Sequence, residues 1–283
     1  MLLFLYSLCL LALLLFPERY CAIARDALMV WSHDVVPSLF PYMVFCRLVS
    51  QHLQKLSFSP IPCIVLLGFA GGSPSGAFVI SSYNQRLSRR EILSLCALTG
   101  TISPVFFLST VNAWIHMPRF CAALTFSHFL SAAFAGITVY FSSAEKNTFT
   151  IIQNPQSSNS KADQNPIVEC IQSVLNVGGC IVVFSVLGGI LSLVIPESIT
   201  VKIQPILEIA GGLHAFFENW TDSARGRILV SALSSFGGFS NLVQNFIVLK
   251  PLHICFSDLL RFAVLRTVFA SLFMMLLHQV SMV

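Results

Sequence analysis

Apolar residues occupy the chain in long runs, and polar residues interrupt these runs only briefly. The runs at residues 120–141 and 259–277 have about the 20 residues that a helix needs to cross the hydrocarbon core of a bilayer. The run at 166–195 is longer still. This pattern predicts membrane-spanning helices.

The first apolar run, residues 2–16, would form a helix of about 22 Å, slightly short for a span. Ala22-x-Ala24 downstream is compatible with signal-peptidase cleavage, but no basic residue precedes the run. We therefore expect residues 1–33 to hold a retained N-terminal membrane helix. At 20–33, mixed charged and apolar residues predict a helix at the membrane interface.

Glycine, serine and proline break four of the apolar runs, at 71–76, 99–104, 208–214 and 236–241. Proline removes a helical hydrogen bond, and glycine adopts backbone conformations that other residues avoid. The breaks therefore predict discontinuous helices. Close helix packing by small residues is the alternative, since Gly68, Gly72 and Gly76 follow a small-xxx-small pattern.

Residues 34–141 and 167–283 repeat the same order of runs and breaks on either side of a polar linker at 142–166. Ala70-Gly71-Gly72 aligns with Ala210-Gly211-Gly212, and Arg119-Phe120 aligns with Arg261-Phe262. If residues 61–83 enter and leave the membrane on one side, three crossings separate the two copies. We therefore predict an all-α polytopic membrane protein with two inverted structural repeats, broken helices and re-entrant hairpins, which is a transporter-like fold. A full crossing at 61–83 would make the repeats parallel.

Composition supports a membrane protein. Of the 283 residues, 55% are hydrophobic and 10% are charged, against about 25% charged in a soluble domain. This length suits six to eight spans without a sizeable soluble module. The net charge of +4 includes no basic run interleaved with aromatic residues, so we expect the lipid bilayer, and not nucleic acid, as the partner. The sequence leaves the oligomeric state open.

Motifs for metal binding and catalysis are absent from the sequence. The nine cysteines include no C-x-x-C pair, and no H-E-x-x-H occurs. The segment Gly72–Gly76 resembles G-x-S-x-G, but Pro74 stands where the serine would be. We expect neither enzymatic activity nor a cofactor or metal.

The breaks are the candidate binding site, because a helix break leaves backbone N–H and C=O groups free near the membrane midplane. Glu208 adds a carboxylate within an apolar run, although a position at the interface near Lys202 is the alternative. Asn241 and Gln244 follow the fourth break and would bind a polar solute or a neighbouring helix. The candidate substrate-binding residues are Gly71, Gly72, Ser73, Pro74, Ser75, Gly76, Thr99, Gly100, Thr101, Ser103, Glu208, Gly211, Gly212, Gly237, Gly238, Ser240, Asn241 and Gln244.

Several of these segments resemble the YlbJ-like sporulation integral membrane proteins. Pro37-Ser38-Leu39-Phe40-Pro41 is similar to that family's P-S-L-F-P-F element, and Gly72–Ala77 is similar to its G-Y-P-x-G-A element. The polar break at 99–107 and Phe236–Ser240 resemble two later elements. Phe78 stands where the family pattern leads us to expect lysine, so a site built on backbone groups fits this chain better.

The resemblance implies a multi-pass protein of a spore-forming bacterium, in the cell membrane or in a membrane of the developing spore. The family is similar to proteins with the nucleoside-recognition (Gate) domain. We therefore expect the protein to move or sense a small polar solute, such as a nucleoside, during sporulation. The alternative is a non-transporting structural or assembly protein of the spore envelope.

Overall fold

The apolar runs form helices in the structure, a computed structural model that describes residues 2–53, 59–143, 165–218, 220 and 222–279. The described residues contain no β-strand. Three helices are long and apolar enough to cross a membrane, namely α8 (Pro118–Ser142), α9 (Pro166–Leu191) and α14 (Phe256–Gln279). Most of the predicted linker, residues 144–164, lies outside the described residues.

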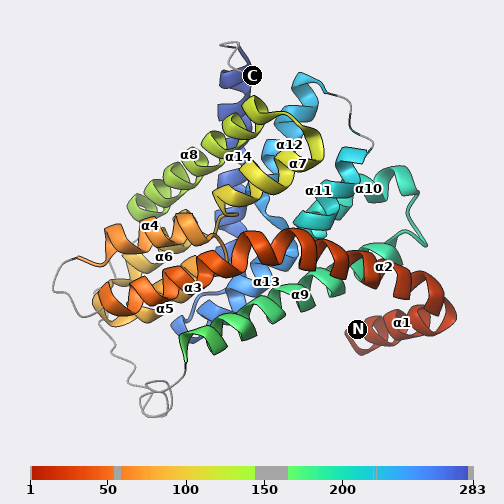
Figure 1. The fold of residues 1–283 in the computed structure, drawn as a ribbon, viewed down its shortest axis with the longest axis horizontal. Coiled ribbons are helices and arrows are strands. Elements are labelled where there is room, and N and C mark those ends of the chain that lie inside the picture. Colours follow the sequence, from red (N-terminus) through yellow and green to blue (C-terminus); the bar gives the residue numbers. More distant parts are fainter. Residues whose placement is uncertain (1, 54–58, 144–164, 219, 221, 280–283) are drawn as a thin grey trace.

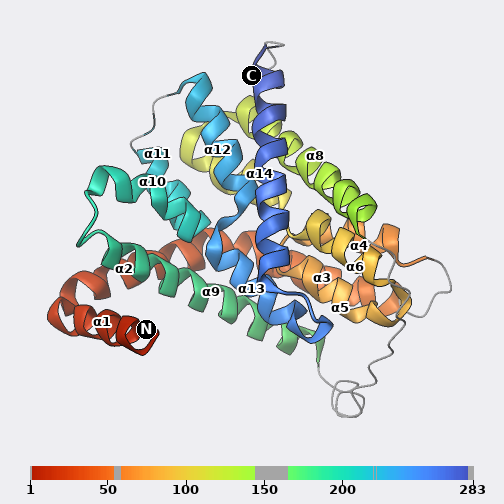
Figure 2. The ribbon, with the colours of Figure 1, turned by 180° about the vertical axis from the view of Figure 1, so that it is seen from behind.

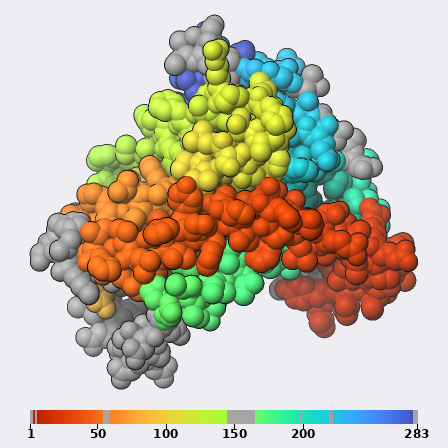
Figure 3. All heavy atoms as spheres, viewed as in Figure 1, coloured from red at the N-terminus to blue at the C-terminus, as the bar shows by residue number. Residues whose placement is uncertain are grey.

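The N-terminal part differs from the prediction of a separate interfacial helix at 20–33. Helix α2 (Pro17–Val30) continues through a π-helical segment (Trp31–Val35) into α3 (Val36–Leu53). The continuous helix runs as one band across a face of the molecule (Figure 3). Helix α1 (Leu2–Leu15) meets it at a bend of 101°, and the bent pair is a fourth candidate span. Pro37 and Pro41 therefore do not end the helix.

The described chain has three or four candidate spans, fewer than the six to eight that its length allows. The other apolar runs are divided into helices of 8–13 residues and one of four, which are too short to cross a bilayer singly. In the first half these are α4 (Ile61–Gly71), α5 (Ser75–Ser82), α6 (Arg89–Thr99) and α7 (Asn112–Ile115). In the second half they are α10 (Glu197–Leu207), α11 (Ile209–Glu218), α12 (Ala224–Phe236) and α13 (Gly238–Leu249).

Helices α4 and α5 form a hairpin, because the chain reverses at the first break. A Cβ atom placed on Gly68 would lie 3.5 Å from the Cα of Gly76, although a straight helix would hold these residues about 12 Å apart. The two ends of the hairpin also meet, since Cys63 Sγ lies 3.8 Å from the hydroxyl of Tyr83. The two helices pack beside each other and next to α3 and α6 (Figure 1).

Helices α10 and α11 form a second hairpin, and the chain breaks at Glu208. A Cβ on Gly212 would lie 2.6 Å from the Cα of Pro205, across the break. Gly211 and Gly212 lie inside α11, so the prediction that they interrupt the helix is wrong. The break occurs at Glu208 because its extended backbone ends α10 and its side chain caps α11.

The second and fourth breaks interrupt two further helical segments. Residues 100–103 separate α6 from a π-helical turn (Phe106–Val111) that leads into α7. Gly237 ends α12 with φ of +83° and begins α13 directly. Helix α14 passes α12 and α13 on one side of the molecule and also packs against α8 (Figure 2). The four predicted breaks are therefore interruptions of helices in the structure.

Three of the four glycines in the pairs at 178–179 and 188–189 of α9 make close packing contacts, and Gly179 makes none. A Cβ on Gly178 would lie 2.6 Å from the indole of Trp31, and one on Gly188 would lie 1.7 Å from Oε1 of Gln204. Trp31 Nε1 also donates a hydrogen bond of 3.2 Å to the carbonyl of Val174. These contacts fix α9 against the π-helical segment and α10.

Cysteine labelling tests whether the α4–α5 hairpin is re-entrant. Ser59 and Gln85 flank the hairpin, and both side chains are exposed. In a background with the exposed Cys21 and Cys255 replaced by serine, Ser59→Cys and Gln85→Cys should react with an impermeant maleimide from the same membrane face. Ala224→Cys reports the sidedness of a segment beyond the hairpin. Reaction of the two flanking positions from opposite faces would show that residues 61–83 cross the membrane.

Candidate solute-binding site

Residues from all four breaks line one cavity of about 70 Å³, which we call the central cavity. One water molecule needs roughly 10–15 Å³ of cavity volume, so the central cavity has room for a small group of water molecules. Six of the predicted site residues line it, namely Ser73, Ser103, Glu208, Ser240, Asn241 and Gln244. The π-helical segment, α3 and α9 complete the wall with Val35, Ser38, Leu39, Val177 and Ile181.

Glu208 places a carboxylate in the wall of the central cavity. Only 1% of the residue is exposed, so its carboxylate is buried within the protein. Its Oε1 accepts a hydrogen bond of 2.8 Å from the N–H of Ala210, and its Oε2 accepts one of 2.7 Å from the N–H of Gly211. The positive end of the α11 dipole therefore faces the carboxylate. No basic side chain among the described residues forms an ion pair with it.

The polar side chains of α13 have unused hydrogen-bonding capacity. Ser240, Asn241 and Gln244 are each at most 7% exposed, yet none of their side chains bonds to another described residue. A buried amide without a partner costs about 1–3 kcal/mol, so these groups require water or a solute. The hydroxyl of Ser38 is already used as a donor, to the carbonyls of Asp34 and Val35, and only its acceptor capacity remains.

The first and second breaks hold each other in place. The N–H of Ser73 donates a hydrogen bond of 2.7 Å to the carbonyl of Thr101. A Cβ on Gly72 would lie 2.5 Å from the backbone N of Ser103, so glycine is needed for this approach. The hydroxyl of Ser73 donates to Oδ1 of Asn245 at 2.8 Å, which connects the first break to α13.

Most of the other predicted site residues lie in packing contacts and not in the cavity wall. Gly76 packs against Thr99, Gly238 against the backbone of Ile209, and Gly71 against Ser75. Pro74 precedes the first turn of α5, and Gly237 is the C-cap of α12. For these glycines the packing alternative is therefore the better description. The remaining residues outside the central cavity are Gly72, Thr99, Gly100, Thr101, Gly211 and Gly212.

Two buried ionisable residues that were not predicted as site residues join the second break to the fourth. His128 of α8 accepts a hydrogen bond of 3.2 Å at Nε2 from the N–H of Ile102, so its Nδ1 carries the proton and donates to Ser235 Oγ at 2.9 Å. Arg266 of α14 is 2% exposed and donates to the carbonyls of Ala97 and Ser235, at 3.0 and 3.4 Å. Both carbonyls belong to the last turn of a helix that ends at a break.

These features define the class of protein, a multi-pass, all-helical membrane protein with a small polar cavity where broken helices meet. The chain is 23% identical to the sporulation integral membrane protein YlbJ of Bacillus subtilis (strain 168). The alignment spans 320 residues and covers 93% of this chain and 78% of that protein. The protein is therefore a membrane protein related to a sporulation integral membrane protein. No family model matches the chain. No solved structure matches it either.

Proposed function

We propose that the protein moves a small polar solute across the membrane and binds it in the central cavity. The observation that carries this proposal is that residues from all four helix breaks line this one cavity. Irregular backbone at membrane depth is tolerated where it lines a cavity, and transporters place their substrate sites at such breaks. The unpartnered amides of Asn241 and Gln244 and the carboxylate of Glu208 would supply the hydrogen bonds to the solute.

The order of elements supports a proposal of two inverted repeats. A hairpin (α4–α5), a broken segment (α6 to α7) and a long helix (α8) are followed by a second hairpin (α10–α11), a second broken segment (α12–α13) and a second long helix (α14). Rocking of one repeat against the other would expose the cavity to each side of the membrane in turn.

Sporulation is the proposed setting, because the relative in Bacillus subtilis is named for it. The nucleoside class is the first to test, since the sequence resembles proteins related to the nucleoside-recognition domain. A solute of that kind is much larger than the few waters for which the central cavity has room. Transport of a nucleoside therefore requires that the cavity widen when the solute binds.

The small cavity favours the second candidate function, a membrane protein that assembles part of the spore envelope and transports nothing. We also propose that the protein has no enzymatic activity. In the structural role, the polar groups of the cavity would bind only water.

Uptake by reconstituted vesicles distinguishes the two functions. We expect uptake of one polar metabolite class driven by an ion gradient, with nucleosides, nucleobases and amino acids as the panel. The same solute should raise the thermal unfolding midpoint, because a ligand at a hundred times its dissociation constant stabilises the folded state by about 2.7 kcal/mol. Vesicles without protein are the control. Absence of both uptake and stabilisation across the panel would support the structural role.

A further inference from the structure

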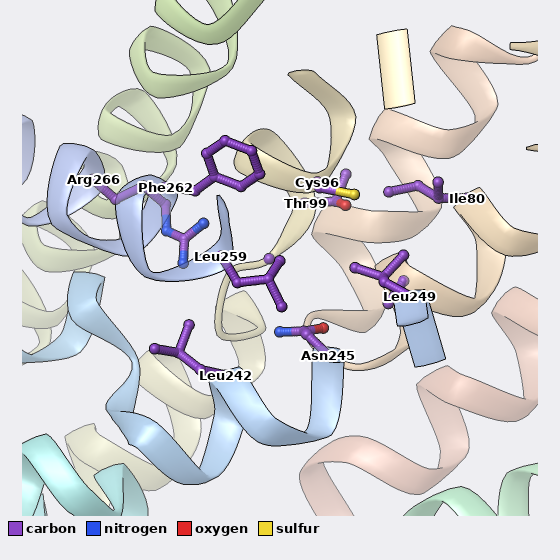
Figure 4. A pocket seen from close by; sticks show the side chains of 11 residues that line it. Ile80, Cys96, Thr99, Leu242, Asn245, Leu249, Leu259, Phe262 and Arg266 are labelled. Carbon is purple, nitrogen blue, oxygen red and sulfur yellow. The ribbon is translucent and has the colours of Figure 1, made fainter. Parts of the chain in front are cut away.

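A second, smaller cavity lies beside Arg266, which we call the arginine cavity. Its volume is about 10 Å³, close to the space of a single water molecule. Figure 4 shows Arg266 from α14 and Asn245 from α13 facing this space, with the amide nitrogen of Asn245 on the side of the guanidinium group. Thr99, at the second break, lines the same space.

The two polar groups that face the arginine cavity have donors without partners. The hydrogen bonds of Arg266 to described residues run from Nε and Nη1 to carbonyls, so three of its five N–H groups have no partner among those residues. Asn245 is 3% exposed; its Oδ1 accepts from Ser73, and its Nδ2 is not bonded to any described residue. Two buried side chains therefore direct unsatisfied donors into one small space.

Charge favours an anion in this space over a neutral molecule. The lining includes no aspartate or glutamate, and no carboxylate among the described residues pairs with Arg266. The C-termini of α6 and α12 offset part of its charge through two carbonyls. The hydroxyl of Thr99 already donates to the carbonyl of Leu95 and is the only side-chain oxygen in the lining besides Asn245 Oδ1. Donors therefore outnumber acceptors around the cavity.

We propose that the arginine cavity binds a small monovalent anion of halide size, held by Arg266 Nη and Asn245 Nδ2. Hydrogen bonds between a charged donor and an anion are about twice as strong as neutral ones. A Cβ on Gly100 would lie 3.2 Å from Arg266 Nη1, so the absence of a side chain at Gly100 lets the guanidinium group approach the second break. The bound anion therefore connects α13 and α14 with that break. The site is separate from the central cavity, so it stands whether or not the protein transports a solute.

Thermal unfolding of the purified full-length chain in detergent tests the site, with chloride replaced by gluconate at constant ionic strength. We expect the unfolding midpoint to rise saturably with chloride by a few degrees, as mass action requires of a ligand that binds the folded state. Arg261→Gln changes an exposed arginine on the same helix and should keep the full chloride effect.

Asn245→Asp is the decisive variant, because it replaces the amide nitrogen with a carboxylate oxygen, which would supply the negative charge beside Arg266 that the anion otherwise supplies. This variant should be as stable without chloride as the natural protein is with it, and chloride should not shift its midpoint. Arg266→Gln should also lose the chloride response if it folds. Equal midpoints of the natural protein in chloride and gluconate would overturn the proposal and leave a water molecule in the cavity. A chloride shift that persists in Asn245→Asp would overturn it as well.

Discussion

Replacing Gly72 with alanine is expected to destabilise the folded protein by about 2–6 kcal/mol, the sum of a backbone term and a packing term. Gly72 has φ of +62° and ψ of −167°, a region that is essentially restricted to glycine. A Cβ there would also lie 2.5 Å from the backbone N and 2.9 Å from the Cα of Ser103. The contact is with backbone at the second break, so a side-chain rotation cannot relieve it.

Gly179→Ala is the matched control for this substitution. Gly179 lies in the middle of α9, and no atom lies within 4 Å of the position that its Cβ would take. Alanine there should leave stability unchanged or raise it by up to about 1 kcal/mol, since glycine is a poor helix former. The measurement is the unfolding midpoint together with the yield of monodisperse protein from membranes. A Gly72→Ala protein as stable and abundant as the control would contradict the packing of the first two breaks.

The positions of the helix breaks could be predicted because local chemistry determines them. Pro74 has no N–H, and Gly72 and Gly237 adopt positive φ angles. The third break lies at the start of the predicted range 208–214, although Gly211-Gly212 is the more visible signal. Glutamate is an uncommon helix cap, so nothing in the local sequence indicated that Glu208 ends one helix and caps the next.

The composition of the cavity wall depends on contacts that sequence order does not reveal. Val177 of α9 and Ser38 of α3 reach the cavity only because these helices pack against the breaks. Hairpin geometry decides which break residues face the cavity and which face a neighbouring backbone, so Ser73 lines the wall while Gly72 packs beside it. A one-dimensional pattern does not distinguish these two neighbours.

The burial of Arg266 has a visible signal in the sequence. Arg266 is an ionisable residue near the middle of the apolar run 259–277, where a charge is costly and functional by default. Its partner Ala97 lies 169 residues earlier in the chain, so the identity of the contact could not be predicted. His128 is similar, because Ser235 is 107 residues away.

Replacing Glu208 with glutamine is expected to abolish most solute binding while the protein stays folded. Glutamine keeps the size of the side chain and one acceptor oxygen, so one of the two cap bonds to α11 survives. It removes the negative charge from the cavity wall. Hydrogen bonds to a charged group contribute about 1.5–3 kcal/mol, which corresponds to roughly a 10- to 150-fold loss of affinity.

Two further variants separate the role of Glu208 in binding from its role as a helix cap. Glu208→Ala removes both cap bonds and should lower stability by about 0.5–2 kcal/mol or more, because two buried N–H groups lose their partners. Glu218→Gln changes an exposed carboxylate at the end of the same helix and should alter neither stability nor uptake. The measurements are vesicle uptake and solute-dependent stabilisation, each normalised to folded protein. If Glu208→Gln retained full uptake, Glu208 would be a structural cap alone, and the amides of α13 would be left as the polar groups that recognise the solute.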